Sequence, residues 1–182
     1  MISHGWDRMC WSLWYIKVAS FSPAIQMSSL ADDKSIIWAW RESCLKLQNL
    51  WPLDTAVCKW YGLTFGDTGT LTENTLIEIH LVNWGLTSIP AALGGLKGLS
   101  YLNLRDNKLT RVPGELADIQ WLTYLNLARN RLSCIPPALG THLTRLKTLY
   151  LTDNCWRFKD SLPVEWRGDG TLRMSGTCDF KR

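Results

Sequence analysis

The side chains with which proteins most often catalyse reactions are few in this sequence and poorly placed. Three histidines are present, His4, His80 and His142, and no serine or cysteine is spaced to act as a nucleophile beside His80. The sequence has neither the G-x-x-x-x-G-K-[ST] pattern of a phosphate-binding loop nor the G-x-S-x-G pattern of a nucleophile elbow. We therefore predict that the chain is not an enzyme, has no catalytic residues and needs no cofactor.

The six cysteines do not predict a metal site. No two of them have the C-x-x-C spacing that is typical of zinc binding, and six are too few to form the disulfide scaffold of a chain of 182 residues. The cysteines therefore leave the redox compartment open.

The residues best suited to a function alternate with leucines in four similar segments. Tyrosine and arginine are prominent among them, and these residue types dominate the energetics of protein interfaces. Ordinary solvated strand positions are the alternative, because tyrosine also favours strands. Lys108 and Arg131 stand at matching positions of successive repeats, one residue after the asparagine, and form an edge pair that either receives an acidic partner or is solvated. The predicted partner-binding residues are Glu78, His80, Tyr101, Asn103, Arg105, Tyr124, Asn126, Thr148, Tyr150 and Thr152.

A repeat positions these residues. The frame L-x-x-L-x-L-x-x-N-x-L recurs with periods of 23, 23 and 24 residues, and the extra residue lies between Leu139 and Leu143. Between the frames a second pattern, I/V-P-x-x-L, recurs three times. A fixed period of this length is the signature of a repeat architecture. The four frames begin at Leu76, Leu99, Leu122 and Leu146.

The spacing predicts coils in which a short strand faces one side and a proline-led turn faces the other. In an L-x-L pair both leucines point inward, and neighbouring coils pair their strands in parallel. The asparagine can bond backbone groups that the bend leaves unpaired. Pro90, Pro113 and Pro136 exclude continuous helices. We predict a short α/β solenoid, a right-handed horseshoe arc with a parallel sheet on its concave face, and Trp84 in the first asparagine slot predicts a cap beside it.

The flanking segments differ from the repeats, as the apolar ends of a solenoid require. Asp32 and Asp33 suit a helix start, and apolar residues at spacings of three and four run to Pro52, which predicts one amphipathic helix of about 18 residues. We expect residues 1–28 to be an N-terminal extension or a weak signal-like segment. Residues 29–75 then form the N-terminal cap, 76–155 the repeats in about four coils, and 156–182 a C-terminal cap.

The segment from Asp33 to Phe65 resembles the N-terminal cap of plant-type leucine-rich-repeat proteins, in which a helix and a C-x-W-x-G-V-x-C motif precede the first repeat. The matching residues here are Cys58, Trp60, Gly62 and Leu63. With the repeats the resemblance covers about residues 32–156, and the 23-residue repeats are also similar to intracellular leucine-rich-repeat proteins of the Ras-signalling type. The plant family includes receptor-kinase ectodomains and secreted inhibitors of microbial wall-degrading enzymes.

One position departs from that family, because Phe65 stands where its second cap cysteine would be. In the family that cysteine forms a disulfide with the first, so Cys58 either pairs elsewhere, for instance with Cys44, or is a free thiol. We interpret it as a buried free cysteine that packs as a small apolar group. Cys155 and Cys178 could join in an oxidising compartment. The location stays open, and the lost cysteine favours the cytoplasm over secretion.

The charge pattern restricts the class of partner. The net charge is +4, and residues 97–182 hold 14 Lys and Arg against 8 Asp and Glu. This bias lacks the dense basic stripe of a nucleic-acid binder, and no apolar stretch is long enough for a membrane span. We predict a protein-protein interaction module in signalling or recognition, which binds a macromolecular partner by its concave face. The alternative is an ectodomain or regulatory fragment of a larger receptor-kinase-like enzyme.

Overall fold

The computed structural model describes residues 33–66, 75–156, 163, 166 and 173–174. The chain divides into two units, Met1–Leu30 and Ala31–Arg182, and all of the described residues belong to the second. The N-terminal extension expected over residues 1–28, with its signal-like interpretation, therefore lies outside the described residues, as do His4 and Cys178.

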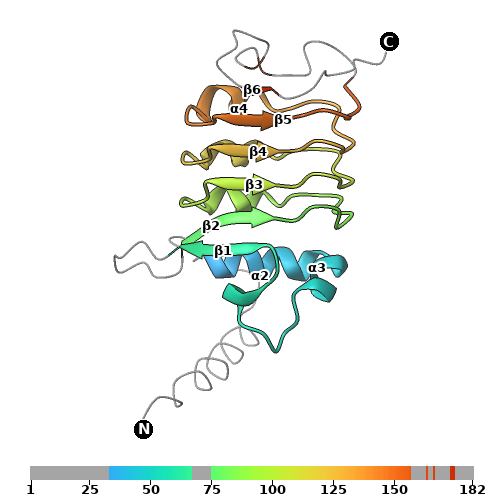
Figure 1. Ribbon diagram of the computed structural model, residues 1–182, viewed down its shortest axis with the longest axis vertical. Helices are drawn as coiled ribbons and strands as arrows, with labels where there is room; N and C mark the ends of the chain where they lie inside the picture. The colour runs from blue at the N-terminus through green and yellow to red at the C-terminus, as the bar shows by residue number, and fades with distance from the viewer. Residues whose placement is uncertain (1–32, 67–74, 157–162, 164–165, 167–172, 175–182) are drawn as a thin grey trace, which may run out of the picture. The chain divides into compact units, whose positions relative to one another are not determined.

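A six-stranded sheet runs through the second unit in the order of the sequence (Figure 1). Its first two strands are antiparallel, and all later pairs are parallel, which confirms the predicted solenoid. The last strand was not expected, because the leucine pattern ends near Asn154. The strands are β1 (Leu63–Gly66), β2 (Thr75–His80), β3 (Tyr101–Asn103), β4 (Tyr124–Asn126), β5 (Thr148–Tyr150) and β6 (Arg173–Met174).

Short helical turns form the other side of each coil. Two of them are single 3-10 turns, η2 (Ala91–Gly95) and η3 (Gly114–Asp118), and each follows a proline as expected. The third, α4 (Pro137–His142), is α-helical, and it contains the extra residue of the 24-residue period. Because an α-helical turn uses more residues than a 3-10 turn, the longer period is absorbed here and the strands remain in register.

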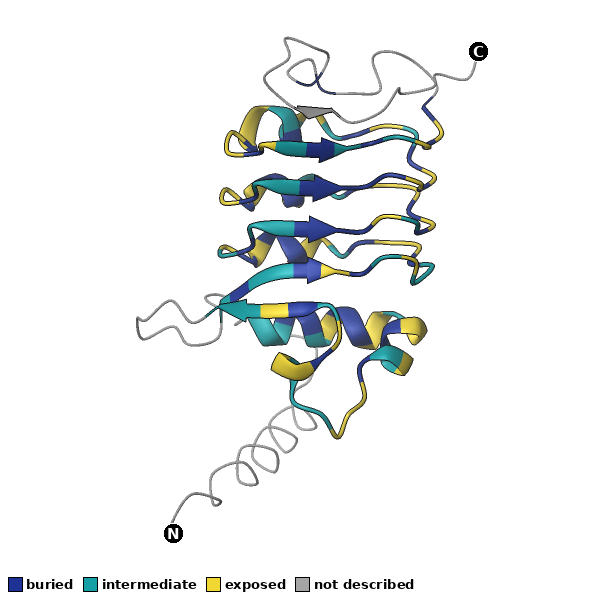
Figure 2. Cartoon of the chain, viewed as in Figure 1, coloured by how far each residue is buried: buried dark blue, intermediate teal, exposed yellow. Residues whose placement is uncertain are grey.

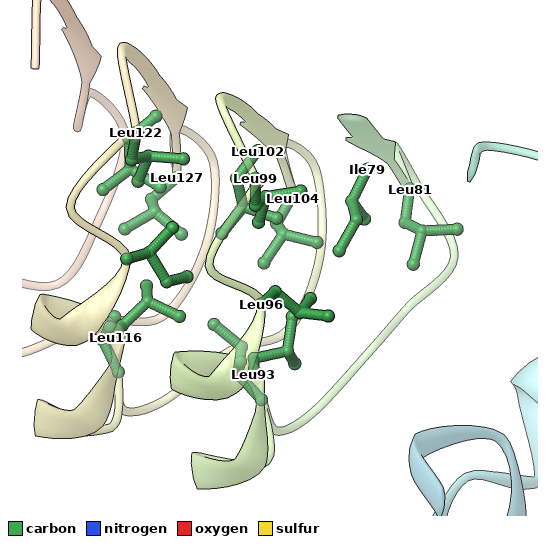
Figure 3. Close-up of a cluster of buried hydrophobic side chains, with 14 of the residues drawn as sticks. Ile79, Leu81, Leu93, Leu96, Leu99, Leu102, Leu104, Leu116, Leu122 and Leu127 are labelled. Carbon is green, nitrogen blue, oxygen red and sulfur yellow. The ribbon is translucent and has the colours of Figure 1, made fainter. Parts of the chain in front are cut away.

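Leucines from successive coils stack into the core between the strands and the helical turns. Figure 3 shows Leu99, Leu102 and Leu104 of one coil beside Leu122 and Leu127 of the next, and all of these side chains are fully buried. Figure 2 shows where these buried residues lie: β3, β4 and β5 each contain buried residues, and many exposed residues lie in the turns. Each buried leucine contributes roughly 1.5 to 3 kcal/mol.

An asparagine ladder joins the coils at the bend after each strand. The amide of Asn107 donates to the carbonyls of Leu81 and Leu104, at 2.7 and 2.8 Å, and its side-chain oxygen accepts from the backbone N–H of Leu86 at 2.9 Å. Asn130 and Asn154 repeat this pattern one and two coils later. The predicted role of these asparagines is confirmed, because each satisfies backbone groups of its own coil and of the preceding coil.

In the described residues before the sheet there are two α-helices, where one was expected. They are α2 (Asp33–Ser43) and α3 (Leu45–Leu50), and the chain is extended at Cys44 between them, with φ −136° and ψ 107°. The expectation of a single 18-residue helix was wrong. A single helix was expected because apolar residues recur with helical spacing on both sides of the break at Cys44. Asp33 ties α2 to the first coil, since its carboxylate accepts from the N–H of Leu76 at 2.7 Å.

Four tryptophans hold these helices together. Trp51 stacks on Trp60 with ring centroids 5.1 Å apart, Trp60 stacks on Trp38, and Trp40 meets Trp51 edge-on. The buried guanidinium of Arg41 lies over the rings of Trp38 and Trp60 and donates to the carbonyl of Trp51 at 2.6 Å. These contacts explain much of the tryptophan content in the first third of the chain.

The described cysteines differ from expectation in one respect. Cys58 is exposed, so its interpretation as a buried apolar group was wrong. It lies in the 3-10 turn η1 (Val57–Lys59), which is followed directly by the buried Trp60. Phe65, which stands in the place of the second cysteine of the motif, packs against the core. The four cysteines in the described part of the chain, which include Cys134 and Cys155, are free thiols.

Candidate functional site

The strand registers bring the predicted binding residues together in columns. In the first column Glu78, Tyr101, Tyr124 and Thr148 lie directly opposite one another on β2 to β5. In the second column the same is true of His80, Asn103, Asn126 and Tyr150. Arg105 and Thr152 come two residues further along their coils, just after β3 and β5.

The four rings of His80, Tyr101, Tyr124 and Tyr150 form one continuous row, which we call the aromatic ladder. The rings of Tyr101 and Tyr124 are parallel with centroids 4.1 Å apart, and His80 stacks on Tyr101 at 6.1 Å. Tyr150 lies 5.7 Å from Tyr124 at a tilt of 49°. The ladder begins and ends in the second column but passes through the first, so the two columns act as one surface.

Two asparagines explain this arrangement. The amide nitrogen of Asn103 lies 3.3 Å from the hydroxyl of Tyr101, and that of Asn126 lies 3.3 Å from the hydroxyl of Tyr124. The side-chain oxygens accept from the backbone N–H groups of Arg105 and Ala128. Each tyrosine therefore leans along its strand toward the second column. Asn103 and Asn126 were predicted as partner-binding residues, but they are only 6% exposed, so they support the ladder and offer little surface to a partner.

The environment of Tyr124 makes its hydroxyl harder to ionise. Burial raises the pKa of Tyr124 above its ordinary value, and the neighbouring hydroxyl of Tyr101 adds to the increase. The hydrogen bond from Asn126 and the charge of Arg105 act in the opposite direction, because both stabilise the phenolate. Tyr124 therefore stays a neutral phenol at physiological pH, and its hydroxyl can both donate and accept hydrogen bonds.

A row of charges borders the ladder at the ends of the strands. Asp106 forms ion pairs with Arg105 at 2.9 Å and with Arg129 at 3.7 Å, and Arg129 also reaches Asp153 at 3.4 Å. Asp106, Arg129 and Asp153 all have a φ near +55°, the left-handed region. Of this row only Arg105 was predicted from the sequence, and Asp106, Arg129 and Asp153 were not. Their signal was present, because these residues stand at the same position of successive coils.

The site contains little that could perform catalysis. Within the described residues no group of three His, Cys, Asp or Glu side chains could hold a metal ion. His80 packs against an aromatic ring, and His142 lies at the end of α4, on the opposite side of the coil from the strands. What the face offers is a row of partly exposed rings with polar groups along one side, an arrangement suited to binding by stacking and hydrogen bonding.

Comparison with known proteins identifies the repeats. The family model described as leucine rich repeat matches residues 74–132, and a second one, for two copies of the repeat, matches residues 120–162. Residues 74–162 of the chain are leucine-rich repeats. No curated protein sequence matches the chain.

Solved structures similar to this leucine-rich-repeat protein include ectodomains of plant receptors. The BIR2 ectodomain from Arabidopsis thaliana is 27% identical, with a TM-score of 0.64 over 80% of this chain and 79% of that one. The ectodomain of the receptor kinase GASSHO1/SCHENGEN3 from the same plant, in complex with CASPARIAN STRIP INTEGRITY FACTOR 2, is 32% identical over 57% of this chain and 12% of that one, with a TM-score of 0.51.

The ectodomain of the Arabidopsis thaliana receptor kinase SOBIR1 shares the fold at 21% identity, with a TM-score of 0.55 over 72% of this chain and 71% of that one. In the described residues of this leucine-rich-repeat protein, no helix is long and apolar enough to cross a membrane.

Proposed function

We propose that this leucine-rich-repeat protein is a non-enzymatic interaction module that binds a protein or peptide partner on its aromatic ladder. One observation carries the proposal: four rings from four strands form an unbroken row on the exposed face of the sheet. Tyrosines of this kind bury a large area on binding and need few rotamers to be fixed, so they provide most of the binding energy in many interfaces.

The solved structures support this class of function. The GASSHO1/SCHENGEN3 ectodomain, which is 32% identical over the matched part, is described in complex with CASPARIAN STRIP INTEGRITY FACTOR 2. Solenoid repeats in general present an extended concave surface to their partners. The charged row of Arg105, Asp106, Arg129 and Asp153 adds a polar rim along one side of the ladder, and such rims set orientation more than affinity.

The test removes the rings and retains the fold. The triple variant Tyr101→Ala, Tyr124→Ala and Tyr150→Ala is expected to lose capture of the partners that the unmodified protein retains from an extract of its own source. Once a partner is purified, titration calorimetry should show affinity weakened by more than about 30-fold, since hot-spot residues contribute about 2 kcal/mol or more each. Far-UV circular dichroism should remain unchanged, because the leucine core is intact.

The matched control is a triple alanine variant away from the sheet face, at Thr87, Arg111 and Thr144, all of which are exposed. It should bind as the unmodified protein does. Full affinity in the tyrosine variant, or an equal loss in the control, would rule out the ladder as the binding site.

A second candidate function is that of an ectodomain or regulatory part of a receptor-kinase-like protein. The similarity to the BIR2 ectodomain over 80% of this chain favours it. Sequencing of full-length transcripts tests it: a reading frame that continues past Arg182 into a membrane span and kinase sequence supports this candidate, and a stop codon there contradicts it.

A further inference from the structure

A shallow, open pocket of about 400 Å³ lies away from the aromatic ladder, where the N-terminal segment meets the first coils. Helix α3 provides one wall, with Lys46 and Asn49, and the turn after β2 provides the floor. Lys108 completes the pocket from the next coil. We call this the junction pocket, and its lining residues are Lys46, Asn49, Asn83, Trp84, Gly85 and Lys108.

Trp84 makes this coil different from those that follow. Every later coil has an asparagine in this slot, where the side chain bonds carbonyls of the preceding coil. The first coil is preceded by the antiparallel strand β1, so this slot does not need to serve an asparagine ladder there. The indole of Trp84 is left half-buried and packs 5.9 Å from the ring of Tyr61, which is 62% exposed.

Gly85 brings a lysine into the pocket. Its φ is +62°, and a side chain at this position would occupy the space that the ammonium group of Lys46 fills. The ammonium therefore lies over the backbone of the turn, next to Trp84. A positive charge, a backbone floor and an aromatic ring thus meet in one place, and the amides of Asn49 and Asn83 can donate to the same ligand.

The positive charge of the junction pocket is not neutralised by the described residues. Neither Lys46 nor Lys108 forms an ion pair with any part of the chain that the structure describes. Asp106 precedes Lys108 by two residues in the same coil, and its carboxylate is held by two arginines. In the first coil the equivalent left-handed position is the uncharged Asn83. Such an uncompensated pair of lysines favours a negatively charged ligand.

We infer that the junction pocket binds an acidic segment of a partner protein, with carboxylates at Lys46 and Lys108 and an apolar side chain against Trp84 and Tyr61. Two lysines from different elements line the same pocket as an aromatic ring, which fits a segment that carries two carboxylates and an apolar residue. This second contact is independent of the aromatic ladder.

The test uses a dye-labelled eight-residue peptide in which two glutamates flank a leucine, and the same peptide with glutamines. Fluorescence anisotropy with the full chain should show binding of the glutamate peptide that weakens as salt is raised, and about tenfold or more weaker binding of the glutamine peptide. The variant Lys46→Glu with Lys108→Glu should weaken the glutamate peptide at least as much. Trp84→Asn, which introduces the residue of the later coils, should also weaken it.

The control variant is Lys59→Glu with Lys147→Glu, which makes the same change in net charge at exposed lysines outside the pocket. It and the triple tyrosine variant of the ladder should bind the glutamate peptide as the unmodified protein does. Equal loss in either of these variants overturns the inference, as does absence of binding. Displacement of the peptide by inorganic phosphate at the same concentration as by unlabelled peptide would show a general anion site and overturn the assignment to a protein segment.

Discussion

The hydroxyl of Tyr124 lies in the middle of the aromatic ladder, beside the amide of Asn126 and the hydroxyl of Tyr101. Sequence spacing places Tyr101 and Tyr124 side by side, because residues at equal positions of successive coils are opposite one another. It does not show that the asparagines two residues later are covered by the rings. Whether the rings cover the asparagines depends on side-chain rotamers, which the repeat pattern does not specify on the exposed face of the sheet.

We predict that Tyr124 titrates above the value of about 10 that is ordinary for tyrosine. As the pH rises, the phenol ionises in the unfolded chain before it ionises in the folded protein. The contribution of Tyr124 to the free energy of unfolding is therefore constant below the pKa of the unfolded chain, and it is lost as the pH rises through the raised pKa of the folded state. The difference in absorbance at 295 nm between the unmodified protein and Tyr124→Phe measures the titration. A midpoint at or below the ordinary value would contradict the prediction.

The bend after each strand shows what a repeat can specify at the level of an element. Asn107, Asn130 and Asn154 were identified from spacing alone, since a polar residue that recurs among leucines must satisfy backbone groups. The break between α2 and α3 could not be found in this way. Trp40 and Leu47 keep a helical spacing across Cys44, and one extended residue does not disturb that pattern.

Replacement of Asn130 by alanine should lower the free energy of unfolding by about 3 kcal/mol, because several buried carbonyl and N–H groups lose their partner at once. Urea unfolding followed by circular dichroism measures the loss. The matched control is Asn49→Ala, an exposed asparagine of α3, which should change stability by less than about 0.5 kcal/mol. Similar losses in both variants would show that the asparagine ladder does not join the coils.

At the scale of the whole molecule, the cap and the coils are linked through backbone contacts that only glycine permits. Gly62 has a φ of +79°, and its carbonyl accepts from the N–H of His80 at 2.7 Å. The cap motif in the sequence contains this glycine, so its presence could be predicted, but the strand it meets could not. The exposure of Cys58 and the junction pocket at Trp84 also follow from this docking of cap on coil, which no repeat encodes.

Gly62→Ala should destabilise the cap end of the solenoid by about 2 kcal/mol or more, since a Cβ there would overlap the carbonyl of His80 and the left-handed backbone disfavours alanine. In a solenoid such a loss is local, so amide hydrogen exchange should accelerate in β1 and β2 before β4 and β5. Gly114→Ala, where no atom is near, is the control and should be neutral. Uniform acceleration across all strands would instead indicate one cooperative unit.

The length of the aromatic ladder also limits the length of ligand that it can bind. Its rings come one from each coil, so they advance along the solenoid with the spacing of hydrogen-bonded strands, about 4.8 Å. A chain lying parallel to the solenoid axis crosses successive strands and meets a new ring at each step, whereas a chain running along one strand meets only one ring. Affinity for an axial ligand should therefore grow with ligand length up to the span from His80 to Tyr150 and then level off, so that the number of coils sets the length of partner that is read.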